Sequence, residues 1–456
     1  MERRTALRGA GGLIAAGAGL GSGAGSSAPV HPPEVPRELA RRDPRASAEA
    51  RAVYAFLADL ENAARAGRPR ATVLGQHVEL HNELLNPEYG DCPGTKPPGY
   101  YYRKAADITG KLPGFVEVDL GPGYGQPGWA VDHARPYNAR WPSGRTEWAY
   151  VDAAVDLATG VWDGLPRRPD GSHNPGGDEP RSDGLAQRLP DNGGGPAGLV
   201  GVSFHQPWPG SPVKGYPQTF WADCPGARDP RWADRLLTPG TDEHRELLVD
   251  LDFLADHLGY LAERGVPVLL RPFHEMNTDT GGGFWWSGLG PERFGRLWRL
   301  AYRHLVETRD LHHLIFVWAP HAWDGEHGHA PWDHYPGDEF VDVVGVDDYD
   351  DRPEAPRDGK AWTGEWYRGL ADYGKPRVLA ETFRLPLGPG REATLDRTPW
   401  TLWTVWGQGL TQHNLSGPRD MNTDAHARAS YESPLTAIGG PHAGAWTRVW
   451  ESLHSP

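Results

Sequence analysis

Eight short apolar runs recur along the chain, and several of them are separated by segments with the spacing of an amphipathic helix. The runs that we interpret as strands cover residues 72–79, 115–120, 199–204, 266–271, 314–318, 341–346, 377–380 and 401–406. One helical segment carries leucines at intervals of four and three residues, namely Leu247, Leu251, Leu254, Leu258 and Leu261. Because strand and helix alternate eight times, the sequence predicts an α/β fold, a (β/α)8 TIM barrel with long loops at the C-terminal face of the strands.

The part of the chain that precedes the first run is predicted to lead into the barrel. Residues 29–46 are rich in proline. A helix is predicted over residues 47–66, with Ser47 as its N-cap. No internal repeat and no linker-separated module is visible in the sequence. We therefore interpret residues 47–456 as a single (β/α)8 domain.

The first 28 residues have the features of an export signal. Arg3 and Arg4 precede a short, weakly apolar run that ends in small residues near Ala24 or Ala28. An arginine pair in this position is typical of twin-arginine signals. The run is too short and too rich in glycine to span a bilayer. We expect a cleaved signal of the twin-arginine (Tat) or the general secretory (Sec) type over residues 1–28, a secreted protein and no membrane anchor.

The chain has two cysteines, Cys92 and Cys224, each followed by Pro-Gly. In an exported protein, one disulfide between two loops is the simplest expectation for such a pair. Two cysteines alone do not complete a structural zinc site, and no metal is expected.

Charge and aromatic content narrow the class of partner. The chain has 46 basic and 60 acidic residues, which gives a formal net charge of −14. This balance argues against nucleic acid or an anionic membrane surface as the main partner. The 20 tryptophans are a large number for this length, and indole planes stack on the apolar C–H faces of sugar rings. We expect some of these side chains to form the core and others to bind sugar.

Two carboxylates lie at the exits of predicted strands. Glu275 follows the run 266–271 within the stretch RPFHEMN, and Glu381 comes directly after the seventh run. Barrel enzymes keep their chemistry at this end of the strands, and two carboxylates among tryptophans indicate glycoside cleavage. Aromatic burial is expected to raise the pKa of Glu275, whereas hydrogen bonds from Tyr349 and Arg271 are expected to keep Glu381 charged.

The segments RPFHEMN with FWWSG, YPGDEFVDVVGVDDYD and VLAET resemble glycoside hydrolase family 26, whose best-known members are endo-β-1,4-mannanases. The resemblance covers roughly residues 70–410. It implies a (β/α)8 barrel that is the catalytic domain, a retaining double-displacement mechanism on mannan-type polysaccharide, and no cofactor. It also implies that Glu275 is the acid/base and Glu381 the nucleophile.

The same resemblance implies further contacts with the sugar. His205 and His274 match histidines beside the cleaved bond, and Tyr349 matches the tyrosine that holds the nucleophile. The residues expected to form an aromatic platform are Trp285 or Trp286, together with Trp403 or Trp406. Two departures from the family pattern, the long segment 278–283 and the pair Thr382-Phe383 after the nucleophile, adjoin the sugar-binding positions. They bear on substrate identity more than on reaction class.

Other interpretations stay open at this point. A metallohydrolase would use some of the 20 histidines, but His274-Glu275 is not followed by a second histidine at the metalloprotease interval. A noncatalytic polysaccharide-binding barrel would keep the tryptophans and typically lose a carboxylate. The same carboxylate pair also suits another β-linked backbone, such as β-1,3-xylan or mixed-linkage β-glucan. Endo or exo action depends on whether the inserts 121–145 and 160–198 block one end of the cleft. We expect a monomer.

Overall fold

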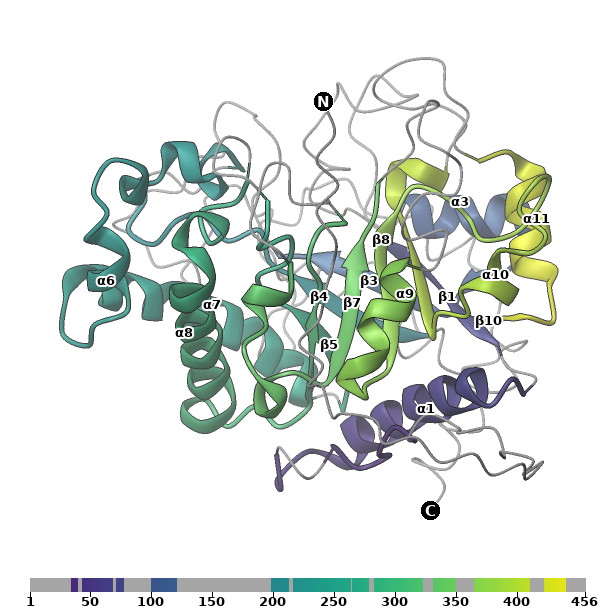
Figure 1. The fold of residues 1–456 in the computed structure, drawn as a ribbon, viewed down its shortest axis with the longest axis horizontal. Coiled ribbons are helices and arrows are strands. Elements are labelled where there is room, and N and C mark those ends of the chain that lie inside the picture. The colour runs from purple at the N-terminus through teal and green to yellow at the C-terminus, as the bar shows by residue number, and fades with distance from the viewer. Residues whose placement is uncertain are drawn as a thin grey trace, which may run out of the picture. The chain divides into compact units, whose positions relative to one another are not determined.

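The computed structural model describes residues 34–39, 43–68, 71–77, 100–120, 198–212, 216–263, 265–278, 283–322, 331–349, 365–410 and 422–439 (Figure 1). The predicted export signal, the insert 121–145, residues 160–197 of the second insert and Cys92 lie outside these residues. The pairing of Cys92 with Cys224 therefore stays a prediction. Cys224 itself is buried.

Eight parallel strands form a closed barrel (Figure 1). They are β1 Thr72–His77, β3 Phe115–Asp119, β4 Leu199–Ser203, β5 Val268–Arg271, β6 Leu314–Trp318, β7 Val343–Asp347, β8 Arg377–Thr382 and β9 Leu402–Trp406. Each strand pairs with the next one in this order, and β1 also pairs with β9, which closes the barrel. The predicted fold is confirmed, and all eight predicted strands are present.

Two short strands lie beside the barrel and have no apolar run long enough to predict them. They are β2 Leu112–Pro113 and β10 Thr436–Gly439. Strand β10 pairs in parallel with β1 and antiparallel with β2, so the two extend the sheet on one side of β1.

Helices connect most of the barrel strands. The α-helices among the described residues are α1 Ala48–Arg65, α3 Tyr100–Thr109, α6 Trp232–Leu236, α7 Asp242–Glu263, α8 Gly290–Tyr302, α9 Glu365–Gly369, α10 Thr394–Arg397 and α11 Asp424–Glu432. Of these, α1 precedes the first barrel strand and α11 follows the last one. The predicted N-cap of the first helix is confirmed, because the hydroxyl of Ser47 accepts a hydrogen bond from the backbone N–H of Ala50 at 3.1 Å. The periodic leucines of α7 are all buried. Among the helices described, none is both long and apolar enough to cross a membrane.

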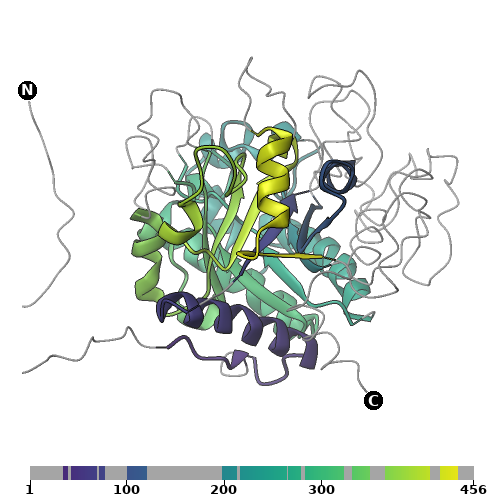
Figure 2. The same ribbon diagram turned by 90° about the vertical axis from the view of Figure 1, so that its right-hand side faces the viewer.

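Apolar side chains fill the N-terminal end of the barrel, where α1 lies against the starts of the strands (Figure 2). Val53 and Leu57 of α1 are fully buried in one cluster with Phe115, Leu199 and Ile315 of the strands. Alternate residues of a strand share a face. Because Phe115 of β3 faces inward, positions 117 and 119 of the same strand also face inward. Both carry carboxylates, and the inside of the barrel therefore changes from apolar to polar toward its C-terminal end.

A buried ion pair also ties α1 to the barrel. Glu61 is fully buried and accepts hydrogen bonds from Nε of Arg377 and Nε of Arg65, each at 2.8 Å. Arg377 begins β8, so the pair joins the helix to the end of the barrel that lies away from the strand exits. Removing one partner of such a pair would leave the other charge buried and uncompensated.

Candidate active site

Glu275 follows β5 in a backbone conformation that is uncommon for a residue with a side chain. Its φ is 52°, in the left-handed region that strains residues other than glycine. The surroundings hold it there. The N–H of Glu275 donates to the carbonyl of Ala319 at 2.9 Å, and its own carbonyl accepts from the hydroxyls of Thr278 at 3.0 Å and Ser287 at 3.1 Å.

Glu381 reaches the site through an irregularity in β8. Ala380 and Glu381 are consecutive and would face opposite sides of a regular strand. The register shifts between β8 and its neighbour on each side, and Asp347 of β7 pairs with Glu381. Ala380 belongs to the cluster inside the barrel, and Glu381 also contacts an inward-facing side chain, Arg271. The irregularity thus lets both residues face inward, as bulges beside active sites commonly do.

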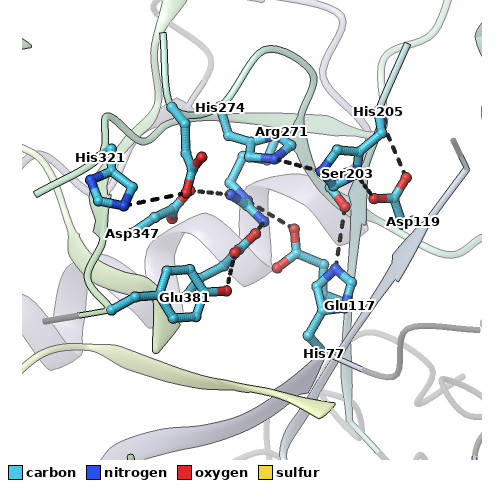
Figure 3. A network of polar contacts seen from close by, with 12 residues as sticks. His77, Glu117, Asp119, Ser203, His205, Arg271, His274, His321, Asp347 and Glu381 are labelled. Carbon is cyan, nitrogen blue, oxygen red and sulfur yellow. Dashed lines mark hydrogen bonds and ion pairs between the residues drawn. The ribbon is translucent and has the colours of Figure 1, made fainter. Parts of the chain in front are cut away.

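Arg271, at the end of β5, joins three carboxylates from three other strands (Figure 3). Its Nε donates to Glu117 of β3 at 2.9 Å, its Nη1 donates to Asp347 at 2.6 Å, and its Nη2 donates to Glu381. The hydroxyl of Tyr349 donates to the other oxygen of Glu381. These are the contacts with Glu381 that the sequence predicts from Arg271 and Tyr349. Glu381 is thereby held by hydrogen bonds at both oxygens.

The carboxylates of Glu275, Asp347 and Glu381 each offer an oxygen within 4.8 Å of the others. Burial and, next, the charge of Glu381 raise the pKa of Glu275 to about 8, although Arg271 opposes the shift. A glutamate that keeps its proton near neutral pH thus lies beside one that receives two hydrogen bonds. This is the pairing required for an acid and a nucleophile at a glycosidic bond, which in retaining enzymes lie about 5–5.5 Å apart.

The same three carboxylates are close enough to share a cation. Arg271 already donates to two of them, however, and supplies positive charge at this position. The three residues offer oxygen ligands only, which suit hard cations rather than the zinc of metalloproteases.

Two histidines form a wall beside the carboxylates (Figure 3). The Nε2 atoms of His205 and His274 lie 3.2 Å apart, so one of them donates to the other. The other ring nitrogen of His205 donates to Asp119 of β3, whose second oxygen accepts from the backbone N–H of His205 at 3.2 Å. Burial, followed by the charge of Arg271, lowers the pKa of His274 well below its usual range. The structure brings both predicted histidines together with the carboxylates.

The predicted aromatic platform is largely wrong. Trp285 and Trp286 are fully buried, and Trp403 is 1% exposed. Their indole N–H groups donate to the backbone carbonyls of Gln206, His274 and Arg384 respectively. Closely packed indoles with satisfied N–H groups form core and offer no face to a ligand. The sequence does not separate core tryptophans from exposed ones, because both kinds occur in the same element: Trp403 and Trp406 lie on β9, and only Trp406 is partly exposed.

Trp406 is the member of the predicted platform that stays partly exposed. Its ring stacks on His77 with centroids 4.0 Å apart and planes 20° from parallel. His77 lies at the end of β1, and its Nε2 is 3.4 Å from the hydroxyl of Ser203. Trp406 is therefore supported on one face at the mouth of the barrel.

One contact residue of the site, Glu117, is missing from the sequence prediction. It lies inside β3 rather than at its exit, and it is 3% exposed. Asp119 ends the strand, whereas Glu117 lies two positions earlier and has no strand exit to mark it. Strand alternation is the signal that identifies it, since residues 117 and 119 share a face.

Comparison with known proteins agrees with the geometry. Residues 197–382 match the sequence model of glycosyl hydrolase family 26, and this segment contains Arg271, Glu275, Tyr349 and Glu381. The resemblance predicted from the sequence motifs is confirmed.

Curated relatives match parts of the chain. A mannan endo-1,4-β-mannosidase of Thermothelomyces thermophilus is 32% identical over 215 residues, which cover 46% of this chain and 38% of that protein. A mannan endo-1,4-β-mannosidase of Bacillus subtilis (strain 168) is 40% identical over 123 residues, which cover 25% of this chain and 32% of that protein. The chain thus spans less than half the length of these relatives.

Solved structures support the fold. GH26A from Muricauda sp. MAR_2010_75 superposes with a TM-score of 0.58 at 22% identity, over 86% of this chain and 97% of that chain. The Podospora anserina GH26-CBM35 β-(1,4)-mannanase superposes with a TM-score of 0.57 at 24% identity, over 90% of this chain and 70% of that chain.

The burial of Trp286 predicts a loss of stability rather than a specific loss of activity. Trp286→Ala should lower the free energy of unfolding by about 3–5 kcal/mol, because it leaves a large cavity in the core. Trp406→Ala should cost less, since that ring is partly exposed, and should weaken sugar binding instead. Denaturant unfolding and oligosaccharide titration of both variants would check this. Equal stability of Trp286→Ala and wild type would contradict the core assignment.

Proposed function

We propose that this chain is a retaining endo-glycoside hydrolase of family 26 that cleaves β-1,4-mannosidic linkages in mannan-type polysaccharides. The observation that carries the proposal is the pair Glu275 and Glu381. Their oxygens lie within 4.8 Å at the barrel mouth, and their surroundings differ. The family match over residues 197–382 supports the same assignment.

In the proposed mechanism, the carboxylate of Glu381 attacks the anomeric carbon and the glycosidic C–O bond breaks. Glu275 gives its proton to the departing oxygen, and a covalent glycosyl-enzyme remains. Glu275, now ionised, then accepts a proton from water. The oxygen of that water attacks the anomeric carbon and displaces Glu381. Two inversions at the same carbon retain the β-configuration.

Arg271 and Tyr349 support the nucleophile in this scheme. Each donates to a different oxygen of Glu381, which fixes the plane of the carboxylate. One of these hydrogen bonds must weaken as the attacking oxygen becomes an ester. The charge of Arg271 stabilises Glu381 again when the intermediate is hydrolysed.

The substrate class and the site of action belong to the same proposal. The relatives that match this chain are described as mannan endo-1,4-β-mannosidases, which supports mannan over β-1,3-xylan or mixed-linkage β-glucan. Because a polymeric substrate does not cross a membrane, we also propose that the features of residues 1–28 direct export. The competing class, a noncatalytic binding barrel, gives no reason to keep both carboxylates.

Purified protein should cleave linear mannan and galactomannan into oligosaccharides of several lengths, as an endo-acting enzyme does. It should release little or no product from β-1,3-xylan and mixed-linkage β-glucan. Chromatographic product profiles over time would measure both. Faster cleavage of xylan or glucan would refute the substrate assignment while leaving the reaction class intact. Tight binding of manno-oligosaccharide without any cleavage would favour the noncatalytic barrel.

The two glutamates should differ when each is replaced. Glu381→Ala removes the nucleophile, so turnover should fall by several orders of magnitude on every substrate. Glu275→Ala should lose activity on mannan but still release the phenol from an activated aryl β-mannoside, because that leaving group needs no proton. Added azide should then speed the second step.

Early product of the wild-type enzyme should be the β-anomer by proton NMR. Thermal unfolding of both variants serves as the control for folding. Appearance of the α-anomer first, or equal loss in both variants with no rescue by azide, would show that the two roles are wrongly assigned.

The raised pKa of Glu275 sets where activity is lost at high pH. The proposed acid must be protonated in the free enzyme, and burial raises its pKa to about 8. The kcat/KM on mannan should therefore persist above the ordinary pKa of glutamate and decline as the pH rises through the raised value. Azide-rescued Glu275→Ala acting on an aryl β-mannoside should lack this decline. The same alkaline decline in the variant would assign it to another group.

A further inference from the structure

Glu117 is a buried carboxylate for which the proposed mechanism has no direct use. It lies in the interior of β3 and is 3% exposed. One of its oxygens accepts from Nε of Arg271 at 2.9 Å. The two other ends of the guanidinium face Asp347 and Glu381, so Glu117 holds the side of Arg271 that points away from them (Figure 3).

A glycine on the intervening strand makes this contact sterically possible. Strand β4 separates β3 from β5, and Glu117 pairs in register with Gly201. A Cβ atom at Gly201 would lie 3.3 Å from Cγ of Glu117 and would overlap the ring of Phe115. Glu117 therefore reaches across β4 to Arg271 because position 201 has no side chain.

We propose that Glu117 is a positioning residue that fixes the guanidinium of Arg271 against Asp347 and Glu381, and that its charge sets how strongly Arg271 acts on the rest of the site. This inference rests on the proposed function. A guanidinium is a rigid planar fork, and an acceptor at Nε restrains rotation about its stem. Without Glu117, the two terminal nitrogens lose that restraint.

The groups around Glu117 determine which residues its charge can act on. His77 is its register partner on β1, and burial lowers the pKa of His77 well below its usual range, so it is neutral. Strand β4 presents Gly201 and Ser203 beside it, and β6 and β9 present no ionisable side chain at this level. The charged neighbours are Arg271 and, beyond it, Asp347 and Glu381, with Asp119 on its own strand.

Burial raises the pKa of Glu117 to about 7, although Arg271 opposes the shift. Glu117 is therefore mostly neutral in acid and ionised above neutrality. Once ionised, it offsets part of the charge of Arg271. Because Arg271 lowers the pKa of Glu275, ionised Glu117 helps the proposed acid to keep its proton at high pH.

Two variants distinguish the positioning role of Glu117 from the effect of its charge. Glu117→Gln keeps the shape and an acceptor but never ionises. It should match wild type at acidic pH, and the alkaline limb of its kcat/KM should move to lower pH by about 0.5–1 unit. Glu117→Ala removes the acceptor, so kcat should fall about 10- to 100-fold at every pH with little change in KM.

Glu61→Gln is the matched control. Glu61 is also a fully buried glutamate that accepts from an arginine Nε, at 2.8 Å, but at the opposite end of the barrel. This variant should lose stability and keep the pH profile and kcat of wild type. If Glu117→Gln has the wild-type profile, or if its loss is uniform in pH and equal to that of Glu61→Gln, the role of Glu117 is only structural and the inference is overturned.

Crystal structures of Glu117→Ala and wild type test the positioning without relying on turnover. In the variant, the guanidinium of Arg271 should lose its hydrogen bond to Asp347 or to Glu381. An unchanged orientation of the guanidinium would overturn the inference. If Glu117→Ala does not fold, the pH profile of Glu117→Gln decides. If wild-type protein cleaves no glycoside, the proposed function has failed, and the crystallographic comparison still gives its own result for the contact.

Discussion

The site depends on one buried guanidinium. Arg271 is only 2% exposed, and a charge so deeply buried is tolerated when carboxylates surround it. Its partners come from β3, β7 and β8, so the ion pairs form only when the barrel brings these strands together. The carboxylates outnumber the cation, and burial raises the pKa of Glu117, Asp347 and Glu275. The cluster therefore retains protons that exposed carboxyl groups would lose, and the proton available for catalysis is a property of the cluster as a whole.

Glycines at two strand positions leave room for this cluster inside the barrel. Position 201 on β4 is glycine, which opens the path from Glu117 to Arg271. Position 345 on β7 is also glycine, and a Cβ atom there would lie 2.6 Å from a methyl group of Val378. Below this level the interior is apolar and α1 packs against it. Arg271 and its carboxylate partners thus lie at the C-terminal end of the barrel interior, and a layer of apolar side chains packs next to them.

The sequence predicts the barrel, its first helix and the two glutamates because each has a local signal. Apolar runs mark strands buried on both faces, and Ser47 marks a helix start. Glu381 follows one such run directly, and Glu275 comes four residues after the end of another. What the sequence misses depends on distant partners. Glu117 belongs to the site because Arg271, 154 residues away, donates to it. Trp286 is core because its indole N–H finds the carbonyl of His274. No local pattern distinguishes either case, since the deciding contact is made only in the closed barrel.

The two glutamates acquire different environments through two different departures from regular backbone. The left-handed turn at Glu275 carries its carboxylate beyond the strand, to a position 3.8 Å from Nε2 of His321. The irregularity in β8 instead turns Glu381 inward, onto Arg271 and Tyr349. Acid and nucleophile must differ in proton affinity while remaining close together. The irregular backbone at both positions gives the two carboxylates different surroundings while their oxygens stay within 4.8 Å of each other, which explains why local strain at Glu275 is tolerated in an otherwise well-packed barrel.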